Sequence, residues 1–269
     1  MRKTLLWILA VIITLAAAVY QRMTGPTYAY RGKADVGGTE IKFKLPRNAE
    51  NVKDCEVWVK APVENIIGNL EYKRYKTEDP WTKIPMERHD DKLVAFLPKQ
   101  PMAGKLAYTV LLIKDEKEVS LTGADPIIIR FKGVVPMAVL LLHVVIMFLA
   151  MLFSTRAGLA ALDRKSNPRK LALWAAAVLF IGGFILGPLV QHFGFGSYWT
   201  GFPLGFDLTD NKTLIAMIGW IIALIAGRKG KPARGWVLAA AILLLIIYTI
   251  PHSLLGSELD YSKLSPPIK

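Results

Sequence analysis

The chain has 269 residues, of which 53% are hydrophobic, and its mean hydropathy is +0.35. This content is too apolar for an ordinary soluble domain of this size and argues against a wholly cytosolic protein. The formal net charge of +13 is typical of nucleic-acid-binding proteins unless membrane topology accounts for it. The single cysteine, Cys55, excludes an internal disulfide and a thiolate metal cluster within the chain.

Five apolar segments predict membrane-spanning helices. The first, residues 5–19, follows Arg2 and Lys3 and is either a cleavable signal or a retained anchor, of which we expect the anchor. The last two are shorter than the ~20 residues that cross a ~30 Å hydrocarbon layer, so they must recruit flanking residues or thin the bilayer. The four later segments are residues 134–153, 171–190, 214–226 and 236–250.

The positive charge is concentrated in segments that face the cytosol if the N-terminus does. Residues 2–3, 156–170 and 228–234 hold eleven basic residues and one acidic residue, whereas the rest of the chain holds 23 basic and 20 acidic residues. The net charge is therefore an orientation signal, and we expect no nucleic-acid partner. We expect the domain between the first two spans, the loop 191–211 and the C-terminal tail on the outer, periplasmic side of the cell (inner) membrane.

Alternating segments between the first two spans predict a β domain. A period of two is typical of half-buried strands, and turn residues such as Gly37, Pro46 and Pro98 separate the segments. About seven strands predict an antiparallel β-sandwich whose pattern resembles immunoglobulin and fibronectin type III modules. The clearest segments are residues 41–45, 55–59, 70–72, 93–97, 106–112 and 127–131.

The expected fold is thus a membrane α-helical bundle, with an N-terminal anchor plus four transmembrane helices, and an extracytoplasmic antiparallel β-sandwich. The expected domains are an anchor or signal (1–20), an outer β-sandwich (21–133), a four-helix transmembrane domain (134–255) and an outer tail (256–269). Only Lys132 and Gly133 join the sandwich to the second span, so we expect it to sit directly on the membrane as a lid or docking platform.

The predicted outer loop contains six aromatic residues and four glycines between His192 and Lys212. One interpretation is an aromatic belt at the headgroup level, with Asp210 capping the next helix. The other is a binding surface, because glycine permits the backbone to approach a flat or bulky group closely. Both interpretations stay open. In the sandwich, residues 87–91, which include His89, are either a binding rim or a solvated turn.

Three histidines are candidate ligands. His143 lies ~13 Å below the outer edge of its span, where an ionisable residue is a functional candidate, unless its imidazole bonds to a neighbouring helix. Two axial haem ligands must lie at one height, so His192 and His252 are the level pair, with Tyr198 and Trp199 as packing surfaces. Three glycines of the third span, at positions 182, 183 and 187, predict close helix packing that keeps His143 away from lipid.

Part of this region resembles the tryptophan-rich loop of cytochrome c assembly membrane proteins. The resemblance implies haem handling at the outer face, with His192 or His252 as the histidine ligand and Trp199 and Asp207 in the loop role. The chain departs from that pattern by having one loop tryptophan, Phe206 before the acid, and no Pro-Lys-Glu. The residues that carry the resemblance are Tyr198-Trp199-Thr200-Gly201, Gly205-Phe206-Asp207, Lys212-Thr213-Leu214-Ile215 and Trp220.

These features support three functional hypotheses. The first is an integral membrane component of a redox or haem-associated complex, with its site at the outer face. The second is a non-catalytic assembly or scaffolding subunit that binds an outer-side protein through the sandwich, since the sequence has no nucleophile elbow, zinc helix motif or phosphate loop. The third is a small transporter or cation-binding protein that uses Asp207, Asp210 and Glu258. In every case the expected partners are the lipid bilayer and other membrane or outer-side subunits.

Overall fold

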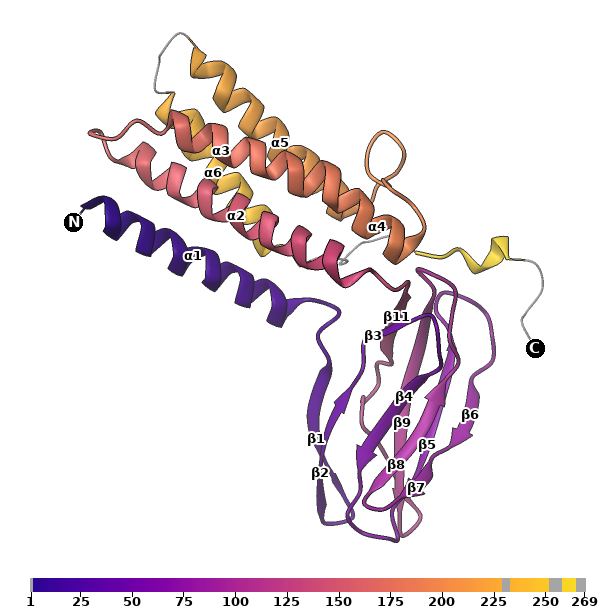
Figure 1. The fold of residues 1–269 in the computed structure, drawn as a ribbon. Helices are drawn as coiled ribbons and strands as arrows, with labels where there is room; N and C mark the ends of the chain where they lie inside the picture. Colours follow the sequence, from indigo (N-terminus) through magenta and orange to yellow (C-terminus); the bar gives the residue numbers. More distant parts are fainter. Residues whose placement is uncertain (1, 229–232, 252–257, 265–269) are drawn as a thin grey trace. The chain divides into compact units, whose positions relative to one another are not determined.

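The computed structural model describes residues 2–228, 233–251 and 258–264, which form two compact units (Figure 1). The helical unit holds the chain up to Pro26 and the described part of residues 135–257. The β unit holds residues 27–134 and the described residues from Glu258 on. Residues 258–264, which are part of the predicted outer tail, therefore belong to the β unit.

Four helices in the described part of the chain are long and apolar enough to cross a membrane. They are α1 (Arg2–Thr24), α2 (Met137–Leu162), α5 (Leu208–Ala226) and one continuous helix over Arg169–Phe195. The continuous helix consists of α3 (Arg169–Phe180), the π-helical segment η1 (Ile181–Leu186) and α4 (Gly187–Phe195). A shorter apolar helix, α6 (Arg234–Thr249), follows. Each of the five predicted spans is thus helical.

Small residues let the helices pack closely, as the sequence predicts. A Cβ on Gly182 would lie 2.6 Å from Sδ of Met147 on α2, and one on Gly183 would lie 2.6 Å from Cγ2 of Thr213 on α5. Alanines fill much of the buried core between these helices. Small side chains therefore permit the close contact between helices. This is the usual basis of helix association in a membrane, where lipid removes the hydrophobic driving force between helices.

Helix α2 is longer than the predicted span. Its apolar run ends at Phe153, but the helix continues to Leu162 and buries Arg156, which the sequence assigned to a basic loop. The Arg156 guanidinium carbon lies 5.4 Å from the centroid of the Trp7 ring on α1. A cation–π contact of this kind explains how an arginine is accommodated beyond the apolar run.

The β unit contains three sheets in the described residues, where a two-sheet sandwich was expected. Strands β1 and β2 form a hairpin whose turn residues, Gly37 and Gly38, have φ of 56° and 80°, as two-residue hairpin turns require. A six-stranded sheet runs β3–β11–β9–β5–β6 with β10 also on β9, and a three-stranded sheet runs β4–β8–β7. All pairings are antiparallel except that of β3 with β11.

All six segments predicted from alternation are strands. Their inward residues form one core, which includes Leu45, Leu70, Leu97, Leu112 and Phe131. The strands are β1 (Tyr30–Val36), β2 (Thr39–Leu45), β3 (Asn48–Glu50), β4 (Cys55–Lys60), β5 (Ile67–Arg74), β6 (Thr82–Pro85), β7 (Glu87–His89), β8 (Lys92–Leu97), β9 (Lys105–Lys114), β10 (Lys117–Ser120) and β11 (Ile127–Lys132).

Candidate functional site

The loop between α4 and α5, residues 196–207, is fixed by the carboxylate of Asp210 in the first turn of α5. Asp210 Oδ2 accepts hydrogen bonds from the backbone N–H groups of Thr200 (2.7 Å) and Gly201 (3.1 Å). It also accepts one from Gln191 Nε2 on α4 (3.0 Å), and the side chain is buried. Hydrogen bonds to a charged acceptor are about twice as strong as neutral ones, so this carboxylate holds the loop in one geometry.

Asp207, and not Asp210, caps α5. Its side chain accepts a hydrogen bond from the N–H of Thr209 (2.7 Å), the usual N-cap contact. The predicted capping by Asp210 is wrong because the loop folds back over the first turn of α5 and directs its own N–H groups at that carboxylate. A Cβ on Gly201 would lie 2.6 Å from Cβ of Asp210, so this close approach requires glycine.

His192 stacks on Tyr198 at the same end of the helical unit. The two ring centroids are 4.1 Å apart and the ring planes differ by 3°. The Nδ1 atom of His192 is shielded from solvent and has no hydrogen-bond partner among the described residues. A buried nitrogen without a hydrogen bond is energetically costly, so a ligand or a partner protein that bonds to this atom would remove that cost.

Trp199 belongs to a row of stacked aromatic rings through which the loop packs against the π-helical segment. Its ring lies against Phe184, with centroids 5.6 Å apart, and Phe184 in turn stacks on Phe180 at 5.9 Å. The indole Nε1 donates to the carbonyl oxygen of Phe202 (3.1 Å). These contacts give Trp199 a structural role in shaping the loop.

His143 is bonded to a neighbouring helix. Its Nδ1 lies 3.1 Å from the carbonyl oxygen of Gly182, in the π-helical segment. The same carbonyl oxygen also accepts the N–H of Gly187 within the helix, and a carbonyl oxygen has two lone pairs, so it can engage both groups. The alternative in which the imidazole of His143 bonds to a neighbouring helix therefore accounts for this histidine.

The structure brings some of the predicted cofactor residues together and separates others. His192, a tyrosine, a tryptophan and Asp207 gather at the α4–α5 loop, whereas His143 is engaged with η1. His252 lies outside the described residues, so its pairing with His192 stays a prediction. Across residues 2–228, 233–251 and 258–264, no group of three or more His, Cys, Asp or Glu side chains is placed to hold a metal ion.

No sequence pattern predicted a buried lysine in this bundle. Lys212 is buried, and its Nζ donates to the carbonyl oxygen of Ile250 just after α6 (2.8 Å). A water-sized cavity of about 20 Å³ lies beside it, next to Tyr248. Lys212 follows a polar stretch and was therefore grouped with the loop, and only the start of α5 at Leu208 places it inside the bundle.

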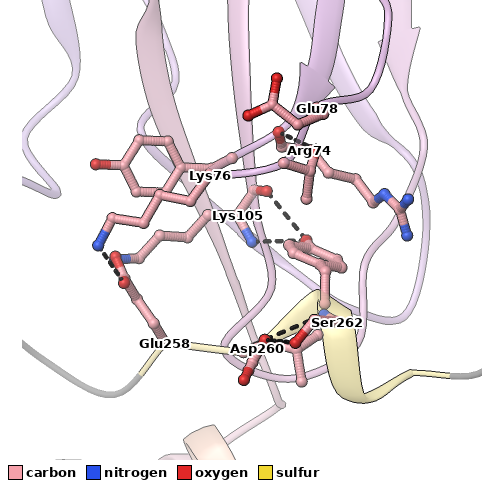
Figure 2. A pocket seen from close by; sticks show the side chains of 11 residues that line it. Arg74, Lys76, Glu78, Lys105, Glu258, Asp260 and Ser262 are labelled. Atoms are coloured by element: carbon pink, nitrogen blue, oxygen red, sulfur yellow. Dashed lines mark hydrogen bonds and ion pairs between the residues drawn. The ribbon is translucent and has the colours of Figure 1, made fainter.

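The β unit has a cleft lined by three basic and three acidic side chains, which sequence patterns did not reveal (Figure 2). Its volume is about 540 Å³, and it is lined by the turn after β5, by Lys105 and by residues 258–262. We call residues 258–263 the C-terminal strap. The Glu258 carboxylate of the strap accepts hydrogen bonds from Lys76 Nζ (2.7 Å) and Lys105 Nζ (2.5 Å). Burial by itself would raise the pKa of Glu258, but these two ammonium groups outweigh burial and lower it.

Further contacts hold the strap in the cleft. The Tyr261 hydroxyl accepts a hydrogen bond from the N–H of Lys105 (2.9 Å), and its ring lies 5.2 Å from the Arg74 guanidinium carbon. Burial raises the pKa of Tyr261 to about 12, so the hydroxyl stays protonated. Asp260 caps the short helix η3 (Tyr261–Lys263) through the N–H of Ser262. Glu258 and Asp260 are thus both engaged within the β unit.

The outward face of the β4–β8–β7 sheet carries two exposed aromatic side chains. Trp58 on β4 is 42% exposed and Phe96 on β8 is 52% exposed. Trp58 is directly opposite Val94, and Phe96 is two residues further along β8, so all three share one face. Lys92 Nζ lies 4.8 Å from the Trp58 ring centroid. We call this surface the aromatic face.

The charged cluster at residues 87–91 has structural contacts. Arg88 donates to the carbonyl oxygens of Ala61 (2.8 Å) and Ile66 (2.6 Å), which fixes the loop before β5. Asp91 pairs with Lys60 at 2.8 Å, and this hydrogen bond lowers the pKa of Asp91. The solvated-turn interpretation of this cluster therefore fits its geometry.

Comparison of the chain with models of protein families finds no match, and comparison with curated proteins finds none either. The functional proposals below therefore rest on the chemistry and geometry of these residues.

Proposed function

We propose that this chain is a multi-pass membrane protein that serves as a non-catalytic assembly subunit and binds another protein through its β unit on the outer side of the membrane. The aromatic face carries this proposal. Fully burying one large apolar side chain contributes about 1.5–3 kcal/mol, and tryptophan is prominent among interface residues that dominate affinity. The ring pair Trp58 and Phe96 is edged by Lys92 and Glu56, and an apolar centre with a charged rim is the usual anatomy of an interface.

Chain connectivity supports placing the β unit and the end of α6 on one side of the membrane. The strap bonds to the β unit from Glu258, and α6 ends at Thr249. The intervening link spans at most ~32 Å when fully extended, which is less than the ~40 Å thickness of a bilayer with its interfacial regions. This supports a membrane crossing by α6, despite its 16 residues.

Basic residues support the orientation. The connections between α2 and α3 and between α5 and α6 are rich in lysine and arginine. The one acidic residue in residues 156–170 and 228–234 is Asp163. The positive-inside rule assigns such connections to the cytosol. The β unit, the α4–α5 loop and the strap are then on the outer side.

The test is co-purification from native membranes in mild detergent. We expect the chain to carry a stoichiometric partner, and the Trp58→Thr, Phe96→Thr double variant to lose it while the β unit keeps its melting temperature. Trp81→Thr is the matched control, since Trp81 is 43% exposed elsewhere on the β unit. A strictly monomeric chain, or a partner retained by the double variant, would refute the proposal.

Haem handling is a second candidate, and the unsatisfied Nδ1 of His192 is the observation that favours it. A single free imidazole nitrogen fits one axial ligand of a haem iron. A bis-histidine site would need His252 as the other ligand.

A visible absorption spectrum distinguishes this candidate. Haem handling predicts a Soret band, in the purified chain or after haem is added, that His192→Ala removes and His89→Ala, at an exposed histidine of the β unit, leaves unchanged. If haem gives the same spectrum with the His192 variant as with the unaltered chain, the candidate is eliminated.

A further inference from the structure

The α4–α5 loop is uncharged over a long stretch. Between His192 and Asp207 the chain has fourteen residues, and none of them is Asp, Glu, Lys or Arg. Connectors that lie in water are usually polar, because charged and polar side chains keep them solvated. This loop joins two helices that are each long and apolar enough to cross a membrane. A segment of this composition, tethered at both ends to candidate spans, is suited to a membrane surface.

The exposed side chains of the loop are all large and apolar at its tip. Phe202 is 64% exposed, Leu204 is 77% exposed and Phe206 is 91% exposed. Pro203 and Gly205 alternate with them and add no polar side chain. Each such side chain would gain about 1.5–3 kcal/mol on full transfer from water to an apolar medium.

Three backbone N–H groups at the tip are hydrogen-bonded. The N–H of Phe202 donates to Asn211 Oδ1 (2.6 Å), and the N–H groups of Leu204 and Gly205 both donate to the carbonyl oxygen of Gly201 (2.9 Å each). Pro203 has no N–H group. Unsatisfied backbone groups cost several kcal/mol each in lipid, so these hydrogen bonds lower the cost of bringing the tip to the membrane surface, where its side chains and not its backbone would enter the acyl-chain region.

We propose that the α4–α5 loop inserts Phe202, Leu204 and Phe206 into the acyl-chain region of the leaflet that it faces. Lipid is the surrounding that fits three independent features: the lack of charge, the hydrogen-bonded N–H groups of Phe202, Leu204 and Gly205, and the position between two candidate spans. The hydrogen bonds that Asp210 accepts from Gln191, Thr200 and Gly201 make the loop rigid. The three side chains therefore enter together and set the depth of α4 and α5 in the bilayer. This inference is independent of the protein-binding function proposed for the β unit.

The test uses nitroxide labels on single-cysteine variants of the full chain in phosphatidylethanolamine–phosphatidylglycerol vesicles. In a Cys55→Ser background, Phe206→Cys and Leu204→Cys report on the loop, and Val52→Cys, at an exposed site of the β unit, is the aqueous control. Lipid insertion predicts collision rates with oxygen several-fold above those of the control, and collision rates with a water-soluble nickel chelate several-fold below.

Two outcomes would overturn the inference. Nickel collision rates at positions 204 and 206 equal to those at position 52 would place the tip in water. Labels that are immobilised and shielded from both reagents would place it against protein. Because both positions are largely exposed, neither substitution removes a packed side chain, and circular dichroism of each variant checks that the helices are retained.

Discussion

Glu258 is the residue on which the strap depends, because its carboxylate neutralises two lysines of the cleft. We expect Glu258→Gln to leave Lys105 half-buried without its anionic partner and to release the strap. Hydrogen exchange of the amides of residues 259–264 should accelerate at neutral pH. Glu78→Gln changes another acidic residue that lines the same cleft and is the matched control. Unchanged protection in the Glu258 variant would show that Tyr261 holds the strap without the ion pairs.

The same group makes the strap sensitive to acid. The pKa of Glu258 is lower in the folded chain than in the unfolded chain, so its contribution is complete at neutral pH and is lost as pH falls through the lowered value. We expect strap amides to exchange faster below the ordinary carboxylate range in the unaltered chain, after correction for intrinsic exchange. The Glu258→Gln variant should lose most of this dependence.

Asp210 is the corresponding residue in the helical unit. Replacing it by alanine leaves two buried N–H groups unpaired, and each such loss costs about 1–3 kcal/mol. We expect Asp210→Ala to lower the melting temperature in detergent more than Asp210→Asn, which keeps an acceptor oxygen. Asp207→Ala removes the cap of α5, worth about 1 kcal/mol, and should have a smaller effect. Equal melting temperatures for Asp210→Ala and the unaltered chain would show that the hydrogen bonds to Asp210 do not stabilise the loop.

Cys55 should be chemically quiet in the folded chain. Burial raises its pKa to about 11, and the thiolate is the reactive form. We expect alkylation by iodoacetamide at neutral pH to be slow in the native protein and fast in denaturant, as followed by mass spectrometry. Rapid native labelling would mean that the end of β4 opens readily.

At the scale of elements, Arg234 joins the start of α6 to the end of α2. Its guanidinium donates to the carbonyl oxygens of Asp163 (2.6 Å), Arg164 (2.9 Å) and Ser166 (2.5 Å). These carbonyl groups follow the last turn of α2, and a planar fork of donors reaches several of them at once. The contact therefore fixes the connection between α2 and α3 against α6.

Arginine at position 234 should not be replaceable by lysine. An ammonium is a point charge and cannot satisfy the same spread of carbonyl oxygens, so we expect Arg234→Lys to lower the melting temperature almost as much as Arg234→Ala. Arg228→Lys, at an exposed position at the start of the connection between α5 and α6, should have little effect. Full retention of stability in Arg234→Lys would show that charge alone is sufficient.

Element positions follow well from sequence periodicity, but contacts at element ends do not. Alternation located six strands, and apolar runs located five helices, because both patterns reflect burial of one face or of the whole surface. The end of α2, the cap of α5 and the strap were missed. Each depends on a partner distant in sequence: Trp7 for Arg156, the folded-back loop for Asp210, and two lysines for Glu258.

At the scale of the molecule, the proposed topology is open to direct test. Single cysteines in a Cys55→Ser background at Ser262 and Ser197 should react with an impermeant maleimide added to intact cells, whereas one at Lys165 should react only after permeabilisation. The reason is that the proposed orientation puts the strap and the α4–α5 loop outside and the basic connections inside. External labelling at position 165, or protection at position 262, would reverse or break the five-span topology.

Composition and periodicity by themselves determined that this chain is apolar enough for membrane spans, that its charge is asymmetrically distributed, and that a β domain separates two helical parts. These properties are local, because hydropathy and alternation depend on neighbouring residues. Only the tertiary structure decided which polar side chains have hydrogen-bond partners within the chain. The Nδ1 atom of His143 lies within hydrogen-bonding distance of the Gly182 carbonyl oxygen, and these two residues meet only when the helices pack. Trp199 and Asp207 bond to residues near them in sequence, and the Nδ1 atom of His192 has no hydrogen-bond partner among the described residues.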